Sequence, residues 1–187
     1  MIRWCTIKAI QTFYKGYHFR SRLEARWAVF FDNLKIKWEY EKEGYQFDDG
    51  TRYLPDFWLP EQNCFIEIKP VRATVDEEEK ATNLAREKKC NIFILSGNIP
   101  SVDELDDWAG LDFIGWSSNE SCVGYDYYYK FCECRKCGRI GIEYDGRSER
   151  IDCECDTGHK TYNYFSFKLI DAYIKARSAR FEFGESG

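Results

Sequence analysis

The sequence predicts a mixed α/β fold, in which helices flank a mixed sheet, followed by a smaller cysteine-rich module. Three observations lead to this prediction. An amphipathic helix is followed by a series of strand-like runs, a helix and a further strand then alternate, and after about residue 120 the composition changes to cysteine, tyrosine and glycine. The 187 residues suffice for one ordinary domain with a small satellite. We therefore expect a core over residues 1–120 and a second module with a C-terminal helix over residues 121–187.

The first helix is predicted over Arg20–Leu34, because its apolar side chains recur at helical spacing. Ser21 is a candidate N-cap. The residues that define the apolar face are Leu23, Trp27, Phe30, Phe31 and Leu34.

Three strand-like runs follow the helix and predict an antiparallel meander. They span Ile36–Glu41, Thr51–Leu59 and Cys64–Lys69. Turn-forming residues separate them at 48–50 and 60–63.

The next segment alternates between helix and strand. A polar helix is predicted over Val75–Lys89, acidic at its start and basic at its end, which suits the helix dipole. The apolar run Asn91–Ser96 then predicts a buried strand parallel to Cys64–Lys69, joined to it by a crossover. Asp112–Trp116 is a further candidate strand, and an amphipathic helix over about Phe165–Arg180 is expected to pack back on the first module.

The overall charge excludes a general nucleic-acid coating protein, which would normally be basic. The net charge is −5 and the pI about 5.2. Any nucleic-acid surface must therefore be local, and the candidate cations are Lys15, Arg20, Arg22 and Arg26, with Lys175, Arg177 and Arg180 in the last helix. No run approaches the about twenty apolar residues of a membrane helix. The first residues do not resemble a secretory signal, so we expect a cytoplasmic protein without a membrane partner.

Charged residues interrupt two runs that otherwise read as buried strands. Glu67 and Lys69 alternate with Ile66 and Ile68 and so point to one face, while Asp56 lies in the apolar run before them. If the two strands pair, the carboxylates approach closely, and a hard divalent cation such as Mg²⁺ or Mn²⁺ relieves their repulsion. Lys69 beside them can stabilise phosphate charge or orient an attacking water.

Glu24 adds a third carboxylate from the first helix. It lies at the edge of the apolar face, so a helix packed on the sheet can direct it towards the same metal.

These residues resemble the signature of the PD-(D/E)xK nuclease superfamily, in its branch with an upstream helical glutamate. The matching elements are Glu24, Pro55-Asp56-Phe57 and Glu67-Ile68-Lys69, and the resemblance covers about residues 15–97. This segment is similar to Holliday-junction resolvases, to transposon endonuclease subunits and to small phage or mobile-element proteins. The resemblance implies a restriction-endonuclease-like core, with Glu24, Asp56, Glu67 and the Ile68 carbonyl as metal ligands. It also implies Lys69 as the catalytic lysine, DNA as the partner and a 5′-phosphate product.

The function expected from these patterns is a Mg²⁺- or Mn²⁺-dependent DNA endonuclease. The main alternative is a non-catalytic nucleic-acid- or protein-binding module on a nuclease scaffold. An RNA-directed nuclease is a second alternative, and a zinc-dependent hydrolase is a weaker one. Many members of the superfamily act as dimers, which leaves homodimer formation open.

Five of the nine cysteines lie between positions 132 and 155, and their spacing predicts a structural zinc site. Cys134 and Cys137 form a Cys-x-x-Cys-Gly knuckle, and Cys153 and Cys155 follow after a hairpin-length insert. We expect these four as ligands, with Cys132 and His159 as substitutes. The module either holds itself together through this site or contacts DNA through Arg135, Lys136, Arg139, Arg147 and Arg150.

Other polar and aromatic residues are assigned ordinary roles. His18 precedes the first helix and is expected to be solvated or capping; the alternative is that it reaches the phosphate or the active-site water. Half of the tyrosines Tyr125, Tyr127, Tyr128 and Tyr129 are expected in the core rather than stacked on bases. The acidic run 76–79 is expected to be a solvated helix start.

Overall fold

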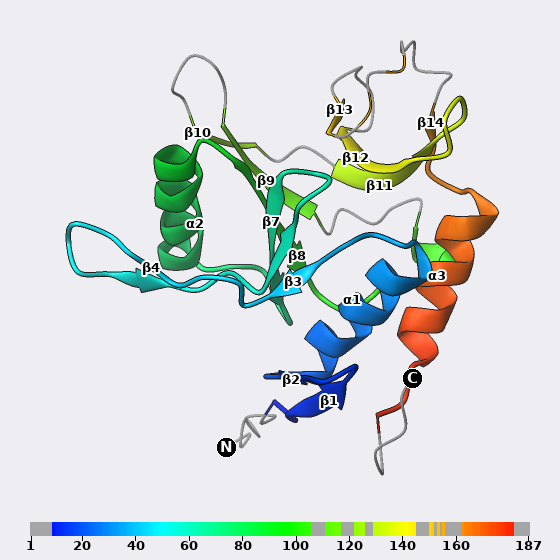
Figure 1. Ribbon diagram of the computed structural model, residues 1–187, viewed down its shortest axis with the longest axis horizontal. Coiled ribbons are helices and arrows are strands. Elements are labelled where there is room, and N and C mark those ends of the chain that lie inside the picture. Colours follow the sequence, from blue (N-terminus) through cyan, green and yellow to red (C-terminus); the bar gives the residue numbers. More distant parts are fainter. Residues whose placement is uncertain are drawn as a thin grey trace, which may run out of the picture.

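The computed structural model describes residues 9–105, 111–116, 122–125, 129–144, 150–151, 153, 155 and 162–181. Its centre is a six-stranded sheet in the order β10-β9-β8-β7-β6-β3 (Figure 1). β7 and β8 run parallel, and the other neighbouring pairs are antiparallel. The predicted mixed fold and the predicted parallel pair are both confirmed. The strands are β3 (Glu39–Tyr40), β6 (Phe57–Leu59), β7 (Cys64–Lys69), β8 (Asn91–Ser96), β9 (Leu111–Trp116) and β10 (Cys122–Tyr125).

Helices cover both faces of this sheet (Figure 1). α2 (Val75–Lys88) lies on one face, where Phe65, Ile92 and Ile94 pack beneath it. α1 (Arg22–Asn33) and α3 (Phe167–Ser178) lie on the other face, in the cluster that contains Ile66, Phe93 and Leu95. The alternation of side chains along β7 and β8 therefore separates two apolar clusters, one for each helical layer.

α1 begins and ends close to the predicted bounds. The Ser21 side chain caps it by accepting a hydrogen bond from the backbone amide of Glu24, at 3.2 Å. Lys35, just beyond the helix, has a left-handed backbone (φ 58°), which turns the chain away. Phe30 of α1 packs on Tyr173 of α3, with ring centroids 4.5 Å apart, so the last helix lies against the first.

α2 also follows its prediction. Thr74 and Glu77 form a reciprocal capping box at its start, and the first turn is acidic while the last is basic. Lys89 ends the helix in the left-handed conformation (φ 52°).

The strands before β7 are shorter than predicted. The expected strand Thr51–Leu59 is divided into β5 (Arg52–Tyr53) and β6, because Pro55 between them has no amide hydrogen to donate. β5 pairs instead with β4 (Tyr45–Gln46) in a separate hairpin. Of the expected strand Ile36–Glu41, only β3 forms. The antiparallel order β3-β6-β7 nevertheless confirms the meander.

A second sheet, in the order β13-β12-β11-β14, follows the central one along the chain. Phe131 of β11 is buried against α1, with its ring centroid 5.0 Å from that of Phe30 and 6.2 Å from that of Trp27. One apolar cluster therefore joins residues from both halves of the chain. The strands are β11 (Tyr129–Cys134), β12 (Ile140–Tyr144), β13 (Arg150–Ile151) and β14 (Tyr162–Asn163). The remaining elements are a hairpin of β1 (Thr12–Tyr14) and β2 (Tyr17–Phe19), and the 3₁₀ turn η1 (Val102–Glu104).

Within the described part of the chain, no helix is both long enough and apolar enough to cross a membrane.

Candidate active site and metal centre

The predicted acidic residues meet where β6 begins and β7 ends. Phe57 pairs with Ile66 in the antiparallel ladder. Asp56 directly precedes β6 and Glu67 directly follows Ile66, so the paired strands bring the two residues near each other. The charge of Glu67 acts on Asp56, which indicates that the two carboxylates are close.

Asp56 is 2% exposed, and protein groups engage both of its carboxylate oxygens. Oδ2 accepts a hydrogen bond from the Ile68 amide at 2.7 Å, and Oδ1 accepts one from the Arg20 guanidinium. Burial raises the pKa of Asp56 well above its usual value, and the nearby charges of Glu67 and Glu24 raise it further. Burial and the neighbouring acidic residues therefore destabilise the charged form of Asp56.

Glu67 is 6% exposed and lies on the α2 face of the sheet. It accepts a hydrogen bond from the Tyr53 hydroxyl at 3.3 Å and forms an ion pair with the Lys69 ammonium at 2.8 Å. Burial, and then the charges of Glu67 and Asp56, raise the pKa of Tyr53 well above its usual value, so this hydroxyl stays a donor.

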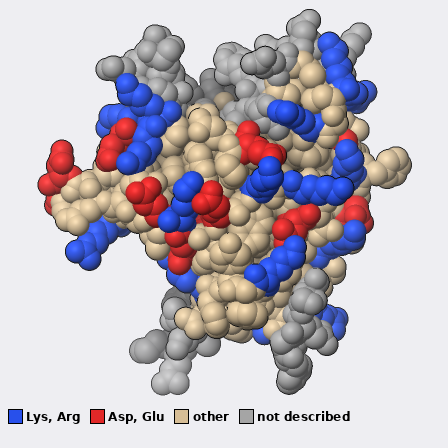
Figure 2. Space-filling model, viewed as in Figure 1, with Lys and Arg blue, Asp and Glu red and all other residues tan. Residues whose placement is uncertain are grey.

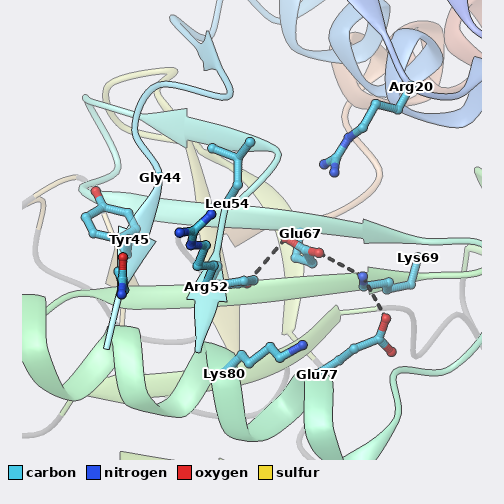
Figure 3. A pocket seen from close by; sticks show the side chains of 11 residues that line it. Arg20, Gly44, Tyr45, Arg52, Leu54, Glu67, Lys69, Glu77 and Lys80 are labelled. Atoms are coloured by element: carbon cyan, nitrogen blue, oxygen red, sulfur yellow. Dashed lines mark hydrogen bonds and ion pairs between the residues drawn. The ribbon is translucent and has the colours of Figure 1, made fainter. Parts of the chain in front are cut away.

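Lys69 joins Glu67 to Glu77 of α2, with 2.8 Å from its Nζ to each carboxylate (Figure 3). Burial lowers the pKa of Lys69, but the ion pairs with Glu67 and Glu77 outweigh burial and raise it. Lys69 is therefore a fixed positive charge next to the buried carboxylates.

Glu24 is 7% exposed and is held by groups close to it in sequence and by one strand residue. Its carboxylate accepts hydrogen bonds from the Ser21 hydroxyl at 2.6 Å, the Arg20 amide at 3.1 Å and the Tyr40 hydroxyl at 2.6 Å. Because Glu24 also contributes to the raised pKa of Asp56, it belongs to the same charged centre.

An open pocket of about 580 Å³ exposes part of this centre (Figure 3). Glu67, Lys69 and Glu77 lie on its floor, and the β4–β5 hairpin and Arg20 form its walls. Four of the lining side chains are basic, namely Arg20, Arg52, Lys69 and Lys80. Across the middle of the face shown in Figure 2, basic and acidic side chains alternate.

The carboxylates are close, but they are not gathered around one point. Among the described residues, the only group of three or more potential ligands whose atoms all lie within 4.8 Å of one another consists of the cysteines treated next. In the arrangement described here, Asp56 and Glu67 are instead each engaged by a cation, Arg20 and Lys69 respectively.

The four cysteines Cys134, Cys137, Cys153 and Cys155 are brought together as the sequence predicted, and they can hold a metal such as zinc. The knuckle is tight: the Gly138 amide donates to the Cys134 carbonyl at 2.7 Å, and Gly138 has a positive φ of 72°. Burial would raise the pKa of Cys134, but backbone amides of Cys137 and Lys136 lower it to about 6. A thiolate is thereby favoured at neutral pH. Cys132 is not part of the group, and His159 lies outside the described residues.

Three contributors to the site were not predicted from the sequence: the Arg20 contact with Asp56, the Tyr53 hydroxyl and Glu77. Glu77 was assigned only to a solvated helix start, although Thr74-x-x-Glu77 is a recognisable capping box that fixes the helix near Lys69. Contacts such as Arg20 with Asp56, which are 36 residues apart, leave no periodic signal in the sequence.

The remaining candidates are accounted for by local packing. His18 is exposed and packs edge-on against Phe13, with centroids 5.1 Å apart. Tyr129 is buried against Phe93. Of the other tyrosines, Tyr127 and Tyr128 lie outside the described residues, as does the side chain of Tyr125.

Several predicted surface cations bond within the fold. Lys15 pairs with Asp32 at 2.9 Å, and Arg26 donates to the Ala179 carbonyl at 3.4 Å. Arg177 donates to the Ile99 carbonyl at 2.6 Å.

Comparisons of the chain with protein-family models, with curated proteins and with solved structures gave no match.

Proposed function

We propose that this protein is a divalent-metal-dependent nuclease with a PD-(D/E)xK core that hydrolyses phosphodiester bonds in DNA. One observation carries the proposal: Asp56 and Glu67 are buried near each other beside Lys69, and Glu67 and Lys69 line a pocket that also contains Arg20, Arg52 and Lys80. DNA is proposed as the substrate, in place of RNA, because the resembling nucleases act on DNA.

The acidic residues fit a hard divalent cation. Burial raises the pKa of Asp56, and the charge of Glu67 raises it further. A divalent cation stabilises such a pair of carboxylates through oxygen ligands. Asp56 and Glu67 would hold it, and the resemblance adds Glu24 and the Ile68 carbonyl. When bound, the cation neutralises phosphate charge and lowers the pKa of a coordinated water.

The chain's own residues supply the remaining requirements. Lys69 is held charged by Glu67 and Glu77 at the pocket floor, where it can stabilise negative charge that develops on a phosphate. Arg52 and Lys80 line the same pocket and suit the backbone of a polyanion. Tyr53 keeps one oxygen of Glu67 oriented.

A structural zinc ion at the four cysteines completes the proposal. Four sulfur ligands leave no open coordination position, so this metal would stabilise the second sheet and take no part in the reaction.

Cleavage of supercoiled plasmid tests the proposal. Wild type is expected to nick or linearise the plasmid with Mg²⁺ or Mn²⁺ and not with EDTA, while Asp56→Ala and Lys69→Ala remain folded by circular dichroism and are inert. Lys42→Ala is the matched control, because Lys42 forms a surface ion pair with Glu39. If Lys69→Ala cleaves as fast as this control, the assigned role of Lys69 is wrong.

A second candidate, a non-catalytic module on a nuclease scaffold, is favoured by one observation. The Arg20–Asp56 and Lys69–Glu67 pairs already compensate the buried charges, as a purely structural network would. Inertness of wild type on supercoiled, branched and single-stranded DNA and on RNA, with either metal, would select this candidate.

A further inference from the structure

Arg20 reaches the acidic centre from the residue that precedes the capping serine of α1. Its backbone amide donates to Glu24 at 3.1 Å, while its guanidinium contacts Asp56 and lies 2.8 Å from Glu41. The side chain is 52% exposed, whereas that of Asp56 is 3% exposed. Arg20 is therefore a partly solvated cation that forms an ion pair with a buried carboxylate.

The two oxygens of Asp56 have different partners. The Ile68 amide is part of the β7 backbone, so the sheet holds the partner of Oδ2 in place. The partner of Oδ1 is a side chain that can move. A divalent cation that takes Asp56 as a ligand through Oδ1 needs the position of the guanidinium, and the two positive charges would repel each other at contact distance.

We propose that Arg20 is an internal counter-ion that competes with the divalent cation for Asp56 and so sets the metal affinity of the site. The inference rests on the metal site of the proposed function. In the absence of metal, the Arg20 guanidinium stabilises the charged form of Asp56. When metal binds, the guanidinium must leave Oδ1.

The surroundings of Arg20 suit such an exchange. Glu41, whose side chain is 29% exposed, pairs with Nε of Arg20, whereas Asp56 contacts Nη2, so Glu41 can keep the guanidinium when Oδ1 is released. Arg20 also lines the pocket together with Lys69, so the displaced side chain has solvated space to enter. Displacement therefore requires a rotation of one side chain and leaves the backbone contact with Glu24 intact.

Calorimetric titration of Mn²⁺ into the zinc-loaded protein tests this inference. Arg20→Gln is expected to bind Mn²⁺ about tenfold more tightly than wild type, because a competing charge next to the ligand is gone. Lys42→Gln is the matched control, since it removes a cation that pairs with Glu39 on the surface and lies outside the pocket lining, and its affinity should equal that of wild type. Asp56→Asn should abolish the binding event, which identifies the site being titrated.

Arg20→Lys supplies a second variant in case the neutral one is unstable. It retains the positive charge and should bind Mn²⁺ with nearly the affinity of wild type. In addition, Mn²⁺ should raise the melting temperature of Arg20→Gln more than that of wild type, because tighter binding stabilises the folded state more strongly.

Equal or weaker Mn²⁺ binding by Arg20→Gln, or no binding by any variant, would overturn the inference. The titration measures binding and not hydrolysis. Tighter binding by Arg20→Gln without cleavage of any substrate would therefore refute the proposed function alone, and cleavage with unchanged affinities would refute the role of Arg20 alone.

Discussion

Lys69 of β7 and Glu77 of α2 form an ion pair across one face of the sheet, with 2.8 Å between Nζ and Oε1. The pair connects the acidic centre to the N-terminal turn of a helix. The position of the Lys69 ammonium therefore depends on the first turn of α2, which contains Glu77.

The first prediction concerns the pH dependence of this pair. The hydrogen bond from Lys69, followed by the Thr74 amide, lowers the pKa of Glu77 from 4.5 to about 2. Because the folded state favours the charged form, its stabilising effect is present above pH 4.5 and is lost as the pH falls towards 2. Glu77→Gln should therefore unfold at lower urea concentration than wild type at pH 7, and the difference should shrink at pH 3. Glu79→Gln, at an exposed position of the same helix, is the control; an equal effect there would refute the ion-pair explanation.

A second prediction separates stability from function at Asp56. Its pKa is raised by burial and then by neighbouring acids, so its charged form destabilises the folded state, and stability is lost as the pH rises through the folded-state pKa. Asp56→Asn should therefore be at least as stable as wild type at pH 7 by thermal denaturation, yet inactive in the plasmid assay. A clear drop in melting temperature would show that the Arg20 pair stabilises the fold more than the buried charge weakens it.

The third prediction concerns the cysteine cluster. Purified wild type should contain one zinc per chain, and Cys134→Ser should lose it together with several degrees of melting temperature, because structural zinc contributes to folding. Cys132→Ala, two residues away and outside the group, should keep its zinc. Metal content is measured by mass spectrometry. Loss of zinc from both variants would mean that Cys132 is a ligand.

A fourth prediction concerns the contact between the two halves of the chain. Phe131 is 1% exposed against Trp27 and Phe30, so Phe131→Ala should reduce the free energy of unfolding by about 3–5 kcal/mol. Phe167→Ala, at a site that is 93% exposed, should have little effect. If Phe131→Ala in denaturant titration behaves like Phe167→Ala, the second sheet does not stabilise α1.

The elements with strong periodic patterns were predictable from sequence alone. β7 and β8 have the predicted bounds, and α1, α2 and α3 differ from prediction only at their ends, because apolar spacing and capping residues are local signals. The run Thr51–Leu59 was wrong as one strand, because pairing with β4 competes with pairing in the central sheet and Pro55 separates the two. Pro55 was visible in the sequence, but no local signal indicated that Arg52–Tyr53 pairs with β4.

Asp56, Glu67 and Lys69 were predictable members of the candidate site, whereas the contacts of Arg20, Tyr53 and Glu77 were not. Alternation along β7 placed Glu67 and Lys69 on one face, and the pairing of β6 with β7 brought Asp56 near Glu67. The contact of Arg20 with Asp56 depends on how α1 is seated on the sheet, which local patterns do not encode.

α1 contributes both a carboxylate of the acidic centre and aromatic side chains that residues much later in the chain cover. The start of this helix carries Glu24, and its aromatic side is covered by Phe131 and by Tyr173 of α3. While a ribosome is still making the chain, the helix emerges long before the residues that cover it. The packing of the helix that carries Glu24 therefore requires residues as far as 173, and a nascent chain that already contains Glu24, Asp56, Glu67 and Lys69 still lacks the aromatic contacts that cover α1.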